Sequence, residues 1–212
     1  MSSKQLPATM AKLNKKLSVK LVLLGDSISA GANASVTTGA RPGMPPYGQL
    51  VADGLQARFG SPVEFKNFAV GGKATPWGIE EIDKIAPLKP DLTIIAFGMN
   101  DASGRTPADV YAANTKTMID KVRAVNPAAE FVLVATMEGN PEWSATSEQH
   151  YLDYREKLLG MAGEGVVVAD MTSVWRELLK YKKFADITGN GVNHPNDFGH
   201  RAYAQVILGL VK

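Results

Sequence analysis

The stretch VKLVLLGDS, residues 19–27, joins a run of apolar side chains to a glycine, an acid and a serine. Residues 19–24 have the short apolar composition of a strand that is covered by helices on both faces. Because Ser27 follows directly, its hydroxyl is expected at the carboxyl end of a strand, where an open parallel sheet presents groups to a ligand. A serine in this place can also simply cap the helix that follows.

Four further apolar runs lie between longer amphipathic stretches. The runs are residues 63–68, 92–97, 131–135 and 166–169. The stretches long enough for crossover helices are residues 47–59, 79–85, 107–125, 147–161, 173–181 and 197–210. This alternation predicts a three-layer α/β/α domain around a five-stranded, mostly parallel sheet with right-handed crossovers. Residues 1–17 precede the first strand and are expected to be a lead-in or linker.

The composition is that of an ordinary soluble globular protein. Of the 212 residues, 45% are hydrophobic and 21% are charged, and the formal net charge is +2. A chain of this length is expected to fold as one domain, and its scattered basic residues speak against nucleic-acid binding. The chain has no cysteine, which excludes disulfides, a thiolate nucleophile and cysteine-ligated zinc.

The sequence also bears on membranes and location. No apolar run approaches the ~20 residues needed to span a bilayer, and the start lacks the apolar segment of a signal peptide. We therefore expect a soluble chain without a membrane span, either cytoplasmic or the mature or truncated part of an exported protein. Nothing in the pattern indicates an oligomeric state.

Two other strand ends carry hydrogen-bond donors. Gly71 and Gly72 follow the second strand, where paired glycines let backbone N–H groups approach a ligand closely, although a plain tight turn has the same composition. Asn100 follows the third strand, and its carboxamide suits an oxyanion; the alternative is an Asx-turn that opens the next loop. Because the carboxyl ends of parallel strands meet at one edge, these groups are expected near Ser27.

The base expected to act on this serine is His194. It lies in the turn-rich segment 190–197, before the last amphipathic stretch, and the proline after it favours extended backbone. His150 and His200 fall within expected helices, where surface or packing roles are more usual. A loop imidazole at the same edge of the sheet is well placed to reach the hydroxyl of Ser27.

In this order along the chain, the groups resemble the marks of the SGNH/GDSL hydrolase superfamily. The matching positions are residues 25–27 (Gly-Asp-Ser), Gly71, residues 98–101 (Gly-Met-Asn-Asp) and residues 194–195 (His-Pro). The resemblance covers nearly the whole chain and implies a flavodoxin-like sandwich, with residues 18–212 as the SGNH hydrolase domain. It also implies a serine esterase that acts on a small-molecule or carbohydrate ester and needs no metal or organic cofactor.

The resemblance further implies a role for each matched residue. Ser27 would attack an ester carbonyl while His194 removes its proton and returns it to the leaving alcohol. The charge on the tetrahedral oxygen would be held by the backbone N–H groups of Ser27 and Gly71 and by the side-chain amide of Asn100.

One position departs from the family. An aspartate usually stands three residues before the histidine, and Gly191 occupies that place here. Asn190, one residue further back, has a carbonyl oxygen that can accept a hydrogen bond from the imidazole. The competing arrangement, which we favour, is a Ser-His dyad oriented by a backbone carbonyl. Asp186 and Asp197 are alternative carboxylates, but a loop or helix-start role suits each better.

The substrate is indicated more loosely. Trp77 follows the glycine turn, and Trp143 lies in the loop after the fourth strand. Both are candidates to line the mouth of the site and stack on a sugar ring, and each can alternatively pack its own loop. The lysine-rich lead-in and residues 191–197 resemble the branch that removes acetyl groups from polysaccharides. We therefore expect a short-acyl (acetyl) esterase of O-acetylated carbohydrates.

Three other functions are alternatives to this one. The first is a lysophospholipase or thioesterase acting on a longer acyl chain, and the second is an inactive sugar-binding module, suggested by the missing aspartate. The third, a nucleotide binder, is disfavoured because residues 25–31 lack both the G-x-G-x-x-G pattern and a P-loop lysine.

Overall fold

The computed structural model describes residues 5–212 of the chain. The strands are β1 (Val19–Gly25), β2 (Val63–Asn67), β3 (Leu92–Ala96), β4 (Glu130–Ala135) and β5 (Val166–Asp170). They form one sheet in the order β2-β1-β3-β4-β5, and every neighbouring pair is parallel. The predicted fold class is therefore confirmed, and the sheet is parallel throughout.

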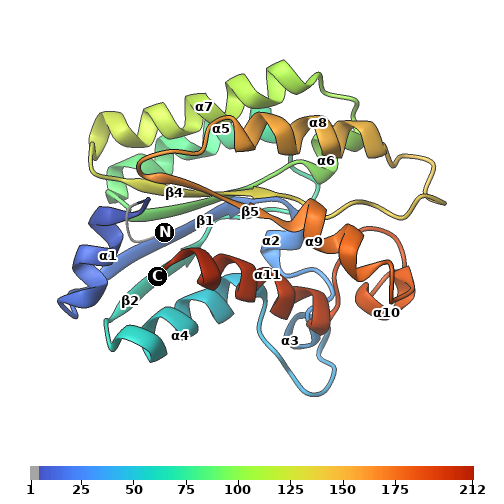
Figure 1. The fold of residues 1–212 in the computed structure, drawn as a ribbon, viewed down its shortest axis with the longest axis horizontal. Coiled ribbons are helices and arrows are strands. Elements are labelled where there is room, and N and C mark those ends of the chain that lie inside the picture. The colour runs from blue at the N-terminus through green and yellow to red at the C-terminus, as the bar shows by residue number, and fades with distance from the viewer. Residues whose placement is uncertain (1–4) are drawn as a thin grey trace.

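Helices cover both faces of this sheet. The helices of the described residues are α1 (Pro7–Asn14), α2 (Ser27–Ala30), α3 (Ser35–Thr38), α4 (Tyr47–Phe59), α5 (Thr75–Ile85), the 3-10 turn η2 (Ala86–Leu88), α6 (Met99–Ser103), α7 (Ala108–Val125), α8 (Glu148–Leu159), α9 (Met171–Leu178), α10 (Phe184–Ile187) and α11 (Asp197–Leu210). Figure 1 shows α5, α7 and α8 on one side of the sheet and α4 and α11 on the other. The three layers follow from this arrangement.

The central strands are the most buried part of the chain. Every residue of β3 and β4 is buried, and in β1 only Lys20 is exposed. Full burial of one such aliphatic side chain contributes roughly 1.5–3 kcal/mol, so these strands form a stable base for the loops that leave them. The edge strand β2 differs, because its residues are half-buried or exposed and only β1 pairs with it. Our expectation of two covered faces does not hold for this strand.

The segment expected to be a lead-in or linker is in large part a structural element. Within the described part of it, residues 5–17, α1 and its N-cap residue Leu6 pack against the core through Leu6, Met10 and Leu13. The buried carboxylate of Glu130 accepts hydrogen bonds from the backbone N–H groups at positions 8 (2.9 Å) and 9 (2.7 Å). A negative charge at a helix N-terminus is favourable, and spacing of three to four residues puts the apolar side chains on one face. Residues 1–4 lie outside the described part.

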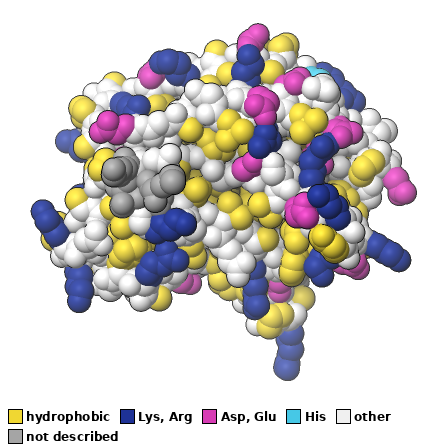
Figure 2. Space-filling view, in the orientation of Figure 1, with side chains coloured by type: hydrophobic (Ala, Val, Ile, Leu, Met, Phe, Trp, Pro, Cys, Tyr) yellow, Lys and Arg dark blue, Asp and Glu magenta, His cyan; other side chains and the backbone are white. Residues whose placement is uncertain are grey.

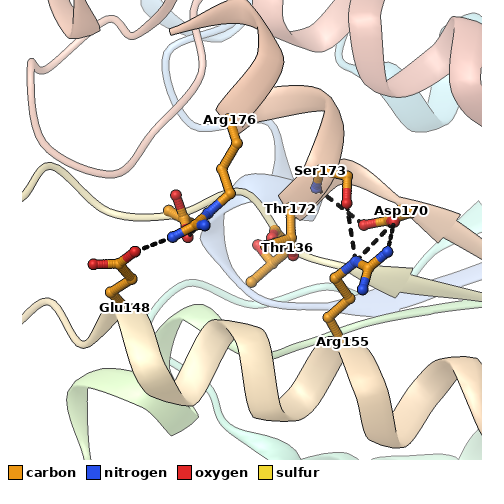
Figure 3. A network of polar contacts seen from close by, with 8 residues as sticks. Thr136, Glu148, Arg155, Asp170, Thr172, Ser173 and Arg176 are labelled. Atoms are coloured by element: carbon orange, nitrogen blue, oxygen red, sulfur yellow. Dashed lines mark hydrogen bonds and ion pairs between the residues drawn. The ribbon is translucent and has the colours of Figure 1, made fainter. Parts of the chain in front are cut away.

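Polar contacts join α8 to the end of the sheet that carries the loops (Figure 3). Arg176 on α9 pairs with Glu148 of α8 and, at 2.7 Å, with Glu138 after β4. On the other side of Figure 3, Arg155 of α8 pairs with Asp170 at the end of β5 at 2.8 Å. Partly exposed ion pairs stabilise a fold by at most about 1 kcal/mol each, so the main effect of these contacts is to fix the position of α8 relative to α9 and to the ends of β4 and β5.

On the face seen in Figure 2, lysine and arginine side chains are spread among acidic and apolar ones rather than gathered in one patch. Among residues 5–212, no helix combines the length and the apolar character that crossing a membrane requires.

Candidate active site

The strand register places several loop starts at one edge of the sheet. Gly25 pairs with Ala96, and Ala135 pairs with Asp170, so β1, β3, β4 and β5 end at nearly the same level. Figure 1 shows α2, α9 and α10 grouped beyond this edge. The groups predicted to carry chemistry all lie in the loops and short helices there.

Ser27 is the first residue of α2 and is half-buried. The helix is capped by Asp26, whose carboxylate accepts a hydrogen bond from the backbone N–H of Ile28 at 3.0 Å. A side chain at Gly25 would come within 2.4 Å of the carbonyl oxygen of Ala96, so only glycine allows this close approach of the two strands. Because Asp26 supplies the cap, the hydroxyl of Ser27 is not needed for that role.

His194 reaches this hydroxyl from the loop before α11. Its Nε2 lies 2.8 Å from the Oγ of Ser27, although the two residues are 167 positions apart in the chain. Burial lowers the pKa of His194, which favours the neutral imidazole near pH 7. Hydroxyl and ring nitrogen thus meet at hydrogen-bond distance, as transfer of a proton between them requires.

The remaining histidines have other partners, as expected. His200 is fully buried, and its Nε2 is bonded to the carbonyl oxygen of Ala32 at 3.1 Å. His150 on α8 is bonded to Ser147 at 2.7 Å.

Asn190 contacts His194, but through the atom opposite to the one expected. Its Oδ1 accepts hydrogen bonds from the backbone N–H groups of residues 192, 193 and 194, at 3.0, 3.1 and 3.1 Å. Its Nδ2 lies 3.0 Å from the Nδ1 of His194 and donates to the Oδ1 of Asn193 at 3.0 Å. The carbonyl oxygen is thus occupied by the loop backbone and does not face the imidazole.

The two alternative carboxylates are engaged elsewhere. Asp186 accepts from the backbone N–H of Lys183 at 2.8 Å, and Asp197 accepts from that of Ser35 at 2.8 Å. Within residues 5–212, no carboxylate forms a hydrogen bond or an ion pair with His194.

Gly71 follows β2 and Asn100 follows β3, the two strands that flank β1 in the sheet. A Cβ added at Gly71 would be 3.6 Å from the Cβ of Ser27, so the glycine backbone lies against the serine. The Nδ2 of Asn100 donates to the carbonyl oxygen of Lys73 at 2.9 Å. A carboxamide has two N–H donors, and this bond uses one of them. Asn100 therefore also ties α6 to the loop that carries Gly71.

Two acids beneath the site were not assigned a role from the sequence. Asp26 is 1% exposed, its Oδ2 has no partner, and burial raises its pKa from 3.8 to about 7. Asp101 is buried as well and accepts from the backbone N–H of Thr75 at 3.0 Å and from its hydroxyl at 2.5 Å; burial raises its pKa. In the sequence, Asp26 directly follows β1 and Asp101 stands five residues after β3, so their positions after buried strands could have indicated that they lie near the site.

A further residue that the sequence did not reveal is Asn140. Its Nδ2 donates to the carbonyl oxygen of Gly191 at 2.7 Å, and its backbone N–H donates to that of Val192 at 2.7 Å. These bonds join the β4–α8 loop to the loop of His194. Because Asn140 and Gly191 are 51 positions apart, a local sequence pattern does not reveal this contact.

The two tryptophans differ in their surroundings. Trp77 lies in α5 and packs edge-on against Phe97, with the ring centroids 6.4 Å apart, and the Nζ of Lys73 lies 5.7 Å from its ring. Trp143 lines an open hollow of about 400 Å³ beside the His194 loop. The other lining residues are Asn140, Glu142, Ser144, Gly191 and Val192. Trp143 is therefore the tryptophan that adjoins the loop of the histidine.

Comparison with known proteins assigns the chain to a protein family. Residues 23–202 match the GDSL-like lipase/acylhydrolase family, and the chain belongs to that family. It is accordingly a carboxylic ester hydrolase of the GDSL type. No curated protein sequence matches the chain significantly.

Solved structures resemble the fold over most of the chain. A two-domain esterase active on acetylated mannans shares 21% identity and a TM-score of 0.75, over 99% of this chain and 52% of the other. An acetylxylan esterase from Geobacillus stearothermophilus shares 20% identity and a TM-score of 0.69, over 91% and 94%. A lipase/acylhydrolase from Enterococcus faecalis shares 22% identity and a TM-score of 0.71, over 90% and 94%. The chain thus spans about half the length of the two-domain enzyme.

Proposed function

We propose that the chain is a serine esterase that removes short acyl groups, above all acetyl, from carbohydrates through an acyl-enzyme on Ser27. The observation that carries the proposal is the 2.8 Å contact between the Oγ of Ser27 and the Nε2 of His194, at the carboxyl edge of the sheet. The preference for acetylated carbohydrates is supported by the structural neighbours, two of which are described as acting on acetylated mannan and xylan.

The proposed reaction has two steps. Ser27 Oγ forms a bond to the ester carbonyl carbon as its proton passes to His194, and the same proton then goes to the leaving sugar hydroxyl. Water, deprotonated by the same ring, then hydrolyses the acyl-serine and releases the acid. Backbone N–H groups of Ser27 and Gly71 and the free N–H of the Asn100 amide hold the oxyanion, each being worth ~3 kcal/mol of barrier in comparable enzymes.

The hollow beside Trp143 is the proposed binding site for a sugar ring of the substrate. An indole face suits the apolar face of a pyranose. The neighbouring carboxylate of Glu142 and the second N–H of the Asn140 amide, whose other polar positions are engaged within the protein, can bond to the sugar hydroxyls. Trp77 packs on Phe97 and is a weaker candidate for this contact.

The nucleophile is tested by Ser27→Ala, assayed on p-nitrophenyl acetate. Turnover should fall to background with the unfolding midpoint unchanged, because the hydroxyl is not the cap of α2. Ser18→Ala is a matched control: Ser18 is exposed and bonded to Glu64, before β1 begins. Undiminished turnover by Ser27→Ala would refute the assignment.

The acyl group is tested on two substrate panels. The first contains p-nitrophenyl esters of increasing chain length, and the second contains acetylated xylo- and manno-oligosaccharides. We expect acetyl to be the best acyl group and release of acetate from the oligosaccharides. A steady rise of kcat/KM with acyl length would instead support a lysophospholipase or thioesterase.

A further inference from the structure

The orientation of the Asn190 amide is fixed by its own loop. Three backbone N–H groups, those of residues 192, 193 and 194, point at Oδ1. If the amide were turned over, its NH₂ group would face these three donors, and all three hydrogen bonds would be lost, together with the bond that Nδ2 donates to the Oδ1 of Asn193. Amide orientation is assigned from such networks, and this network allows one answer.

The fixed amide decides where the proton of the neutral imidazole lies. The Nδ2 of Asn190, a donor, lies 3.0 Å from the Nδ1 of His194, so Nδ1 has to be the acceptor. A neutral imidazole carries one hydrogen, which must then be on Nε2. Nε2 consequently donates to the Oγ of Ser27, from which it lies 2.8 Å.

We propose that Asn190 is a positioning residue that stabilises the Nε2–H tautomer of His194. In this tautomer Nε2 has no lone pair with which to accept the proton of Ser27, and the preference for it therefore limits the rate of ester hydrolysis. The inference rests on the proposed function, since it concerns the same serine and histidine. It reverses the usual effect of the third residue of a catalytic triad, which stabilises the Nδ1–H form and the imidazolium.

The attack of Ser27 on the ester requires the other tautomer of His194. Attack by Ser27 requires a lone pair on Nε2, to which the serine proton moves as the Oγ–carbon bond forms. His194 must therefore first lose its Nε2 proton to solvent and gain one on Nδ1. That form places an N–H of the ring against an N–H of Asn190 across 3.0 Å. The imidazolium formed during attack meets the same clash, with no carboxylate beside it.

The substitution Asn190→Asp tests the proposal. One carboxylate oxygen can keep the three backbone bonds while the other faces Nδ1 and accepts from Nδ1–H. Loss of the corresponding carboxylate in a Ser-His-Asp protease, with its geometry kept, lowers kcat by about 10⁴-fold through the tautomer. We expect kcat on p-nitrophenyl acetate to rise by at least about 10²-fold, with a smaller change in KM.

The pH profile gives a second readout. A carboxylate beside the ring stabilises the imidazolium, so the acidic limb of kcat/KM should move to higher pH in Asn190→Asp. Asn193→Asp is the matched control, because it adds the same charge to the same loop, and Asn193 contacts Asn190 rather than the ring. It should leave both rate and tautomer close to those of the parent chain. An equal gain in this control would overturn the proposal in favour of a general charge effect.

The tautomer itself can be read without turnover. In ¹⁵N NMR spectra of the histidine side chains near neutral pH, Nδ1 of His194 should resonate as an unprotonated nitrogen and Nε2 as a protonated one, and Asn190→Asp should exchange the two. A protonated Nδ1 in the parent chain, or no gain in kcat from Asn190→Asp, overturns the proposal. If Asn190→Asp fails to fold, the parent spectrum still decides. Failure of the proposed function shows separately, as turnover that survives Ser27→Ala.

Discussion

Asp26→Asn should remove a large part of the pH dependence of stability. The carboxyl group of Asp26 is 1% exposed, and one of its oxygens, Oδ2, has no hydrogen-bond partner. The other accepts from the backbone N–H of Ile28 at 3.0 Å, a bond that an asparagine side chain can keep. Burial, with the nearby charge of Asp101 adding to it, raises the pKa of Asp26 to about 7.

The magnitude and sign follow from linkage. A shift from 3.8 to about 7 corresponds to about 4 kcal/mol at 1.36 kcal/mol per pH unit. The folded state holds its proton more tightly than the unfolded chain, so this stability is fully present below about pH 4 and is lost as pH rises to about 7. Between about pH 5 and about pH 8 the parent should lose about 3 kcal/mol from this group.

Urea denaturation at these two pH values measures the effect. The free energy of unfolding of Asp26→Asn relative to the parent should become more favourable by about 3 kcal/mol from the lower to the higher pH. Any free-energy cost of burying the asparagine amide is the same at both pH values, so it cancels when the two differences are compared. Asp53→Asn, on the exposed side of α4, is the control and should leave the pH dependence unchanged. The reasoning is refuted if Asp26→Asn and the parent lose stability in parallel.

Two further substitutions test other contacts. In Glu130→Gln a single amide oxygen replaces the two carboxylate oxygens that accept from the backbone N–H groups at positions 8 and 9. The free energy of unfolding should therefore fall by about 1–3 kcal/mol, and the amide hydrogens of α1 should exchange faster. Unchanged protection of α1 would show that the lead-in is held by its apolar face alone. In Asn100→Ala the expected loss is about 10²-fold in kcat with little change in KM, because the amide is asked to act in the transition state. An effect confined to KM would remove Asn100 from the oxyanion site.

The sheet could be predicted from sequence to within about one residue at each strand end. For β1, β3, β4 and β5 the reason is that buried parallel strands are largely apolar, whereas β2 is half-buried or exposed and carries this signal only weakly. The helices over residues 47–59 and 197–210 agree with α4 and α11 at both ends. Short helices such as α2, α6 and α10 were missed, since four or five residues do not reveal a helical period. The eight-residue helix α1 was not predicted either, because residues 1–17 were expected to be a lead-in or linker.

For the site, the meeting of Ser27 and His194 could be predicted from strand order and loop position. The orientation of the Asn190 amide could not, because it depends on three backbone N–H groups whose directions exist only in the folded loop. The same applies to Asn140, whose partners are supplied by a distant segment. Residue type indicates which chemistry is available, whereas tertiary hydrogen bonds decide which atom faces which.

The two bonds from Asn140 to the histidine loop constrain how the enzyme can be diversified. Through these bonds the β4–α8 loop, which lines the hollow beside Trp143, and the loop that carries His194 are held together. An insertion after β4 that reshapes this hollow is therefore expected to displace the imidazole of His194 as well.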